Sequence, residues 1–430
     1  MAPKHAIAFS NNKGGSGKTF MAFQIACEAA RSRPDAKVCV VDFSLYSDIS
    51  ALMLGGSARE GIGAPMRGLQ TCVDVTEESN RAEGLVRALE LAADARRGNV
   101  GGKQDDRDGA GGGAGRRGSV FGTWFARESA SMVRHDPNTE VDLTDFMIKP
   151  NDVNEAVPEN LYLIAGAGTV SWNPETTAMS DGSEQDIPLW ARSGDDWVDA
   201  GRVFRDAVRN LPGDFDAIFV DTDHLAACVL TKLAFASMDS IVIPLSYNDM
   251  DFNRLFADIT GNGLFTDVLK SMNESGHLRA RVKKMMFTRV GSTANAPTQS
   301  PGGISSPFTP TKTSTAQMDD MARQIWSACD QPVYKALFAD IDSLEAKDGN
   351  AVNSFMREYF GMFKLVPEMA SLLSTMNGIP VCTMTSKTYT AANGLSGNTS
   401  AAVLNSLKAE LSASARDILD GRYNAPIAQS

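Results

Sequence analysis

Residues 6–20 read AIAFSNNKGGSGKTF, and this stretch decides the fold. The apolar run at its start predicts a buried strand, the glycines after it end that strand, and Thr19 opens a helix-compatible pattern that continues to about Ala30. Glycines let the backbone curl until successive N–H groups point inward, where the N-terminus of the helix adds partial positive charge. The stretch therefore predicts a strand, an anion-binding loop and a helix, with a tight glycine turn as the plainer alternative.

Two residues at the end of the loop have the chemistry to bind a nucleoside triphosphate. Lys18 can reach the outer phosphates as a point charge, and the Thr19 hydroxyl can ligate the magnesium ion that bridges them. The residues predicted to bind the nucleotide along this stretch are Asn12, Gly14, Gly15, Ser16, Gly17, Lys18, Thr19 and Phe20.

The loop departs from the pattern G-x-x-x-x-G-K-[ST] at its first position, where Asn12 and Lys13 precede the glycines. The form K-G-G-x-G-K-T resembles the deviant Walker A motif of the ParA/MinD family of dimerising ATPases. That resemblance implies ATP, Mg²⁺ and a sandwich dimer in which Lys13 crosses to the nucleotide of the partner subunit. A second cation there offsets charge that develops during phosphoryl transfer. Lys13 is thus a predicted catalytic residue, and a solvated surface lysine is the alternative.

A second parallel strand is predicted at Lys37–Asp42, a β-branched run that ends in a carboxylate. Open α/β folds bind ligands at the carboxyl ends of their strands, so Asp42 is predicted to approach the magnesium water shell or the neighbouring lysine, and it is a predicted catalytic and metal-site residue. A strand-end turn aspartate is the alternative. Where the family has a further aspartate that positions the attacking water, this chain has Ser44. Asp48 is a candidate substitute, and hydrolysis is expected to be slow, partner-dependent or absent.

The segment Phe215–Asp223 (FDAIFVDTD) predicts another core strand, which delivers Asp221 to the magnesium shell. It resembles the family's Walker B segment Y-D-x-I-I-I-D-T-P, with Asp223 in place of the proline. Asp221 is therefore a predicted nucleotide and metal ligand, and a structural aspartate is the alternative. The predicted metal-site residues are Thr19, Asp42 and Asp221.

Further elements complete the prediction of a single doubly wound α/β domain over residues 1–430, a P-loop NTPase fold with a mainly parallel sheet and helices on both faces. Strands are expected at 158–166, 236–244, 282–287 and just after Gly378, and helices at 199–210, 317–329, 354–377 and 401–419. Resemblance to the family covers residues 6–50, 215–255 and 376–420.

Two segments read as insertions within that domain. Residues 95–150 contain a stretch dense in glycine and charge, which predicts a flexible insertion, either a solvated linker or an arm that touches nucleic acid or an acidic partner. Residues 291–350 combine a loop rich in Ser, Thr and Pro with a helical stretch.

Composition narrows the class of protein. Hydrophobic residues make up 43% of the chain and charged residues 22%, as in soluble globular proteins. The net charge of −11 argues against a uniformly basic nucleic-acid-binding face, although Arg279, Arg281, Lys283 and Lys284 form a local candidate. No apolar run suggests a membrane span or a signal sequence, and the last helix has too few cations for a membrane anchor. A cytoplasmic protein is expected.

The sequence is compatible with three functions. The resemblance implies an ATP-dependent dimerising switch that positions a cargo, such as plasmid or chromosomal DNA or a protein assembly, with a ParB-like or other activating partner and with non-specific DNA as a candidate ligand. Ser44 favours a nucleotide-binding dimeric scaffold with little or no hydrolysis. A small-molecule kinase or synthetase is the weakest of the three, because the sequence offers no identifiable substrate acid or base.

Overall fold

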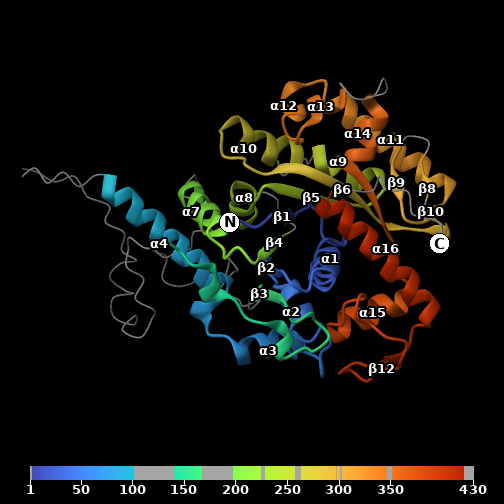
Figure 1. Ribbon diagram of the computed structural model, residues 1–430, viewed down its shortest axis with the longest axis horizontal. Helices are drawn as coiled ribbons and strands as arrows, with labels where there is room; N and C mark the ends of the chain where they lie inside the picture. Colours follow the sequence, from blue (N-terminus) through green and yellow to red (C-terminus); the bar gives the residue numbers. More distant parts are fainter. Residues whose placement is uncertain are drawn as a thin grey trace, which may run out of the picture.

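A seven-stranded sheet forms the centre of the molecule, and helices cover both of its faces (Figure 1). The computed structural model describes residues 2–100, 140–166, 197–223, 228–256, 263–296, 298–300, 303–345 and 351–420 of the 430-residue chain. The strands of the sheet run in the order β11-β6-β5-β1-β4-β2-β3, and every neighbouring pair is parallel. The predicted doubly wound, mainly parallel α/β fold is thereby confirmed.

The strands of the sheet are apolar along most of their length because helices bury both faces. In β4, all eight residues are buried. The bounds of the seven strands are β1 (His5–Phe9), β2 (Lys37–Phe43), β3 (Leu161–Ile164), β4 (Phe215–Thr222), β5 (Ser240–Leu245), β6 (Arg281–Val290) and β11 (Phe360–Lys364).

Each face of the sheet has its own hydrophobic core. One core joins alternate strand residues such as Ile7, Phe9 and Phe219 to α1 and α16, and the other joins Ala8 and Val220 to α4, α7 and α8. This alternation follows from the two-residue period of a strand. The helices that cover the sheet are α1 (Lys18–Ser32), α2 (Asp48–Met53), α3 (Arg67–Val75), α4 (Ala82–Val100), α7 (Trp197–Arg209), α8 (Val229–Ser237), α9 (Asp249–Phe256), α10 (Lys270–Glu274) and α16 (Ala401–Asp420).

The amphipathic helices follow their sequence pattern closely. In α7 the apolar residues Val203, Phe204, Ala207 and Val208, at helical spacing, are all buried. Along α16 Leu404, Leu407, Leu411, Ile418 and Leu419 are likewise buried. Short 3₁₀ turns at Glu78–Asn80, Leu143–Phe146 and Pro150–Asp152 and a π-helical turn at Leu264–Leu269 connect the larger elements.

The predicted helix at 354–377 is wrong, because the chain changes there from helix to strand and back. Helix α14 (Ala351–Tyr359) stops at the edge strand β11, which pairs with β6, and α15 (Glu368–Asn377) follows. A Cβ at Gly361 would lie 2.6 Å from the sulfur of Met286 on the neighbouring strand. Glycine at position 361 therefore lets the Met286 side chain pack closely against β11, where the apolar spacing alone suggested a helix.

The predicted strand after Gly378 is also wrong. Gly378 ends α15 in the left-handed conformation, with φ of 64°, which confirms the turn. The chain then continues as a turn, since the backbone N–H groups of Thr383 and Met384 donate to the Pro380 carbonyl. The N–H of Val381 donates to the side chain of Gln24 in α1 instead of to a strand.

The segment predicted as an insertion at 291–350 contains more regular structure than a loop. Two small antiparallel ladders precede the helices: β7 (Ser292–Ala294) pairs with β10 (Thr309–Pro310), and β8 (Thr298–Gln299) pairs with β9 (Ser305–Ser306). The helices of this segment are α11 (Lys312–Ala328), α12 (Pro332–Lys335) and α13 (Ile341–Glu345). Further along the chain, β12 (Tyr389–Thr390) pairs with β13 (Ser396–Gly397).

The insertion predicted at 95–150 is only partly described. Residues 95–100 form the end of α4, residues 140–150 are described, and residues 101–139 lie outside the described part of the chain. That it is flexible stays a prediction. In the described parts, no helix is long and apolar enough to cross a membrane.

Candidate nucleotide-binding site

The anion-binding loop lies where β1 leaves the sheet and α1 begins. Gly15 and Gly17 adopt left-handed backbone conformations, with φ of 78° and 85°, which glycine reaches without strain. Gly17 occupies the N-cap position of α1, and no side chain caps the first N–H groups of the helix. A Cβ built at Gly14 or Gly15 would meet no atom within 4 Å. The loop therefore has room beside an uncapped helix N-terminus, as a phosphate site requires.

Lys18 and Asp221 meet at the base of this loop. The Lys18 Nζ lies 2.9 Å from the Asp221 Oδ1 and also donates to the Thr222 carbonyl. Lys18 is 8% exposed and Asp221 is fully buried. Burial raises the pKa of Asp221, while the charge and hydrogen bond of Lys18 and a hydrogen bond from Thr19 act in the opposite direction. The structure thus brings together three residues that the sequence predicted for phosphate and magnesium binding.

Several buried polar atoms around the loop lack a hydrogen-bond partner among the described residues. They are the Oγ of Ser10, the Oδ1 of Asn11, the Oγ of Ser16 and the Oδ2 of Asp221. Buried polar groups in native proteins are almost always hydrogen-bonded, so a cluster of unpaired ones points to a polar ligand. Phosphate oxygens and the water shell of Mg²⁺ would satisfy both donors and acceptors of this kind. The residues present therefore fit a magnesium nucleotide.

Asp42 lies beside Asp221 on the neighbouring strand, with their Cα atoms paired in the ladder between β2 and β4. Each of its carboxylate oxygens accepts one backbone and one hydroxyl hydrogen bond: Oδ1 from Ser44 at 3.0 and 2.6 Å, and Oδ2 from Ser50 at 3.0 and 2.6 Å. Burial, followed by the charge of Asp221, raises the pKa of Asp42 to about 7 against these four bonds. A magnesium-bound water that donates to Asp42 would replace one of the four.

Ser44 and Asp48, the two residues in question for positioning water, differ in their surroundings. The Ser44 hydroxyl is buried and committed to Asp42, and Asp48 is exposed in the first turn of α2. The backbone N–H of Leu45, next to Ser44, donates to the Oδ2 of Asp223 at 2.9 Å. The loop after β2 therefore lies against Asp223.

The other predicted residues lie around the loop. Lys13 is partly exposed, and its predicted reach to a partner subunit stays a prediction. Asn12 donates to the carbonyl of Arg254 in α9, which fastens the loop to the next helix along the sheet edge. Phe20 packs against the core that contains α1.

Two residues at the site escaped sequence reasoning. Thr288, at the end of β6, donates from its hydroxyl to the Ser16 carbonyl at 2.8 Å and holds the loop in place. Ser50, which donates to Asp42, stands eight positions beyond it in α2. No short motif links either one to the loop. For Asp223, the sequence showed only an aspartate two residues after Asp221, at a position where the family has proline.

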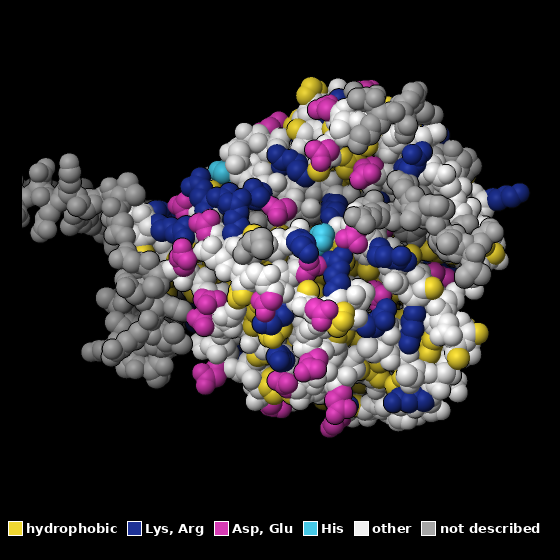
Figure 2. All heavy atoms as spheres, in the orientation of Figure 1, with side chains coloured by type: hydrophobic (Ala, Val, Ile, Leu, Met, Phe, Trp, Pro, Cys, Tyr) yellow, Lys and Arg dark blue, Asp and Glu magenta, His cyan; other side chains and the backbone are white. Residues whose placement is uncertain are grey.

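The predicted DNA-binding cluster on β6 is engaged within the chain. Lys284 forms an ion pair with Asp417 at 2.8 Å, and the two side chains are 4% and 3% exposed. Lys283 donates to the Leu419 carbonyl, and Arg279 pairs with Asp239. On the face seen in Figure 2, Lys and Arg gather over α7 and α8 but alternate with Asp and Glu. The predicted DNA-binding cluster on β6 is therefore not a free basic surface.

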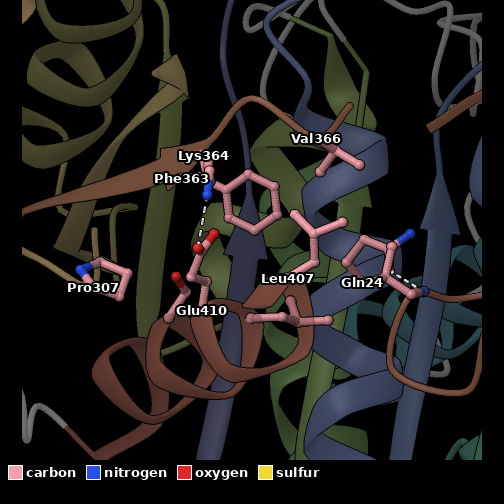
Figure 3. Close-up of a pocket in the computed structure, with 10 residues that line it drawn as sticks. Gln24, Pro307, Phe363, Lys364, Val366, Leu407 and Glu410 are labelled. Carbon is pink, nitrogen blue, oxygen red and sulfur yellow. Dashed lines mark hydrogen bonds and ion pairs between the residues drawn. The ribbon is translucent and has the colours of Figure 1, made fainter. Parts of the chain in front are cut away.

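A narrow apolar pocket lies apart from the phosphate loop, between α1, β11 and α16 (Figure 3). Gln24, Leu407 and the Lys364–Glu410 ion pair, with its 2.9 Å separation, line it. The Gln24 side chain is occupied by Ser374 and by the backbone N–H of Val381. We interpret this pocket as part of the packing between α1 and α16.

Comparisons with known proteins found similar solved structures. No family model matches the chain, and no curated protein matches it significantly. One of the similar structures is a Cyanothece McdA variant in complex with ATP, with 12% sequence identity, coverage of 96% of this chain and 95% of that one, and a TM-score of 0.46. A second is ParA of pNOB8 bound to non-specific DNA, with 16% identity, coverage of 85% and 86%, and a TM-score of 0.42. A third is a cobyrinic acid a,c-diamide synthase of Mycobacterium smegmatis with an ATP analogue and magnesium, with 13% identity, coverage of 75% and 96%, and a TM-score of 0.36. The chain has a doubly wound, parallel α/β fold with a glycine-rich loop between β1 and α1, and the solved structures distantly similar to it include an McdA and a ParA.

Proposed function

We propose that the chain is an ATP-binding switch that dimerises around Mg²⁺-ATP and positions a cargo, with slow hydrolysis stimulated by a partner. The observation that carries the nucleotide site is the group of unpaired buried polar atoms beside Lys18 and the uncapped start of α1. Phosphate would lie against the loop and Lys18, and Thr19 and Asp221 would hold the magnesium ion. Magnesium, when bound, neutralises charge on the transferring phosphoryl group.

Dimerisation is the part of the proposal that depends on Lys13. The K-G-G-x-G-K-T form carries the resemblance to dimerising ATPases, and Lys13 lies partly exposed on the loop. A cation donated across a dimer interface would act like an arginine finger. A ParB-like activator and non-specific DNA are the candidate partners, and a cytoplasmic location accords with this role.

A dimeric scaffold with little hydrolysis is the second candidate, and Ser44 is the observation that favours it. The Ser44 hydroxyl donates to Asp42 and carries no charge with which to orient a water molecule. Scaffold and switch share the nucleotide site and the dimer, and they differ in turnover.

The test combines size-exclusion chromatography and light scattering with ADP or ATP plus magnesium, alongside phosphate release. Wild type is expected to dimerise with ATP, and Lys13→Ala is expected to stay monomeric. Lys387→Ala, an exposed lysine near the β12 hairpin, is the matched control and should dimerise as wild type does. A wild type that remains monomeric with every nucleotide would remove the sandwich dimer from the proposal.

A further inference from the structure

The end of β4 carries a second carboxylate, Asp223, whose position the proposed nucleotide site does not explain. Asp223 is 2% exposed. Strands β2 and β4 pair in parallel, with Asp42 opposite Asp221 and Phe43 opposite Thr222. One step beyond this ladder lie Ser44 on one strand and Asp223 on the other. The carboxylate that is missing at Ser44 therefore has a counterpart at the same level of the sheet.

Asp223 follows directly on the strand that carries Asp221. Side chains two residues apart on a strand share a face, so Asp221 shares that of Phe219, and Asp223 is the first residue after β4. Phe219 belongs to the core that packs on α1, the helix that begins at the phosphate loop. The hydrogen bond from the Leu45 N–H to the Oδ2 of Asp223 shows that the loop after β2 lies against this carboxylate.

Neither of the other nearby candidates offers a buried charge at this edge. The Ser44 hydroxyl is neutral and donates to Asp42, whose own oxygens accept four hydrogen bonds. Asp48 is exposed at the start of α2. A group that orients the attacking water in phosphoryl transfer needs an acceptor within hydrogen-bond reach of that water. Asp223 is the residue whose burial and place on the sheet suit this task.

We propose that Asp223 supplies the carboxylate that orients the attacking water in ATP hydrolysis, in place of the residue lost at Ser44. This inference rests on the proposed function. The water oxygen forms a bond to the γ-phosphorus while the bond from that phosphorus to the β–γ bridging oxygen breaks. ADP leaves, and the proton of the water passes by way of the Asp223 carboxylate to the inorganic phosphate that is released.

The central experiment is Asp223→Asn, with single-turnover phosphate release and binding of a fluorescent ATP analogue measured separately. The amide oxygen can still accept from the Leu45 N–H, so a residue that only anchors the loop would tolerate this change. A carboxylate that orients water would not, and the hydrolysis rate is expected to fall by about 100-fold or more while analogue affinity stays within roughly twofold. Asp48→Asn is the matched control and should keep the wild-type rate.

A second variant exchanges the two side chains, Ser44→Asp with Asp223→Ser, and so moves the carboxylate to the neighbouring strand. It is expected to hydrolyse ATP at least about tenfold faster than Asp223→Ser alone. If Asp223→Asn fails to fold, the rate of Asp223→Ser against that of wild type decides the matter, and equal rates in these two proteins would overturn the inference.

Wild-type turnover in Asp223→Asn would overturn the inference and leave ATP binding standing. So would a wild type that binds ATP but releases no phosphate, with or without DNA. A wild type that binds no ATP would instead remove the proposed function, and the inference with it.

Discussion

Asp42 and Asp221 lie side by side on neighbouring strands, yet different groups stabilise their charges. Asp221 is paired with Lys18 and retains one oxygen without a hydrogen bond among the described residues, whereas both oxygens of Asp42 are fully engaged by Ser44 and Ser50. A magnesium ion attracts the oxygen that is not already committed. At the residue scale, Asp221 is therefore the stronger candidate ligand, and Asp42 holds the loop after β2 in place.

The spacing of the site residues along the chain explains which of them the sequence could predict. Lys18, Thr19 and the glycines lie within one motif whose spacing is fixed by local geometry, and Asp221 ends a recognisable strand. Thr288 and Ser50 reach the site because β6 ends there and α2 begins there. Neither contact leaves a periodic pattern in the sequence: Thr288 is far from the loop along the chain, and Ser50 reaches Asp42 across a turn.

His5 gives a prediction for the dependence of stability on pH. Burial lowers the pKa of His5 to about 4, assisted by the charge of Lys283 and then Arg33 and opposed by Asp216 and Asp420. Between about pH 6.5 and 4 the unfolded chain binds a proton that the folded protein excludes, so stability falls as the pH drops through this range. From pH 7.5 to 5, wild type should lose about 2 kcal/mol more than His5→Asn, measured by urea unfolding. Equal losses in the two proteins would contradict the prediction.

At the scale of elements, every strand of the central sheet was predictable except the edge strand β11. Strands β1, β2, β4, β5 and β6 are buried on both faces and read as apolar runs. Edge strand β11 follows directly on the helix α14, so its aromatic residues continue the helical spacing of apolar positions. The spacing of apolar residues therefore predicted one long helix, whereas in the structure residues 360–364 form a strand that pairs with β6.

The ion pair that joins β6 to α16 gives a second prediction. Lys284 and Asp417 are almost fully buried, and Lys284 also donates to the Glu358 carbonyl. Asp417→Asn leaves a buried ammonium without its counter-charge, so the free energy of unfolding should drop by about 3–5 kcal/mol. The control is Lys284→Met with Asp417→Leu, which removes both charges and is expected to cost less. Chemical denaturation measures both, and an Asp417→Asn midpoint equal to wild type would refute the expectation.

At the scale of the whole molecule, nucleotide binding should stabilise the folded state. The phosphate loop is fastened to β1, β6 and α9 at once, through its own chain, Thr288 and Asn12. A ligand at 100 times its Kd adds about 2.7 kcal/mol, which for a chain of this size raises the thermal midpoint by roughly 3–5 °C. A non-hydrolysable ATP analogue with magnesium should give this shift in wild type and Lys387→Ala but not in Lys18→Ala. A shift that survives Lys18→Ala would place the nucleotide elsewhere.

The central position of β1 in the sheet has a consequence for how the protein is made. Strand β1, which ends at Phe9, leaves the ribosome well before its partners β4 and β5, which end at Thr222 and Leu245. At about 5–20 residues per second, roughly 10 to 50 s of synthesis separate β1 from its second neighbour. Until β4 is made both edges of this apolar strand are unpaired, and until β5 is made one edge still is, which invites wrong pairing. We therefore expect the nascent chain to need protection by chaperones until β5 has emerged.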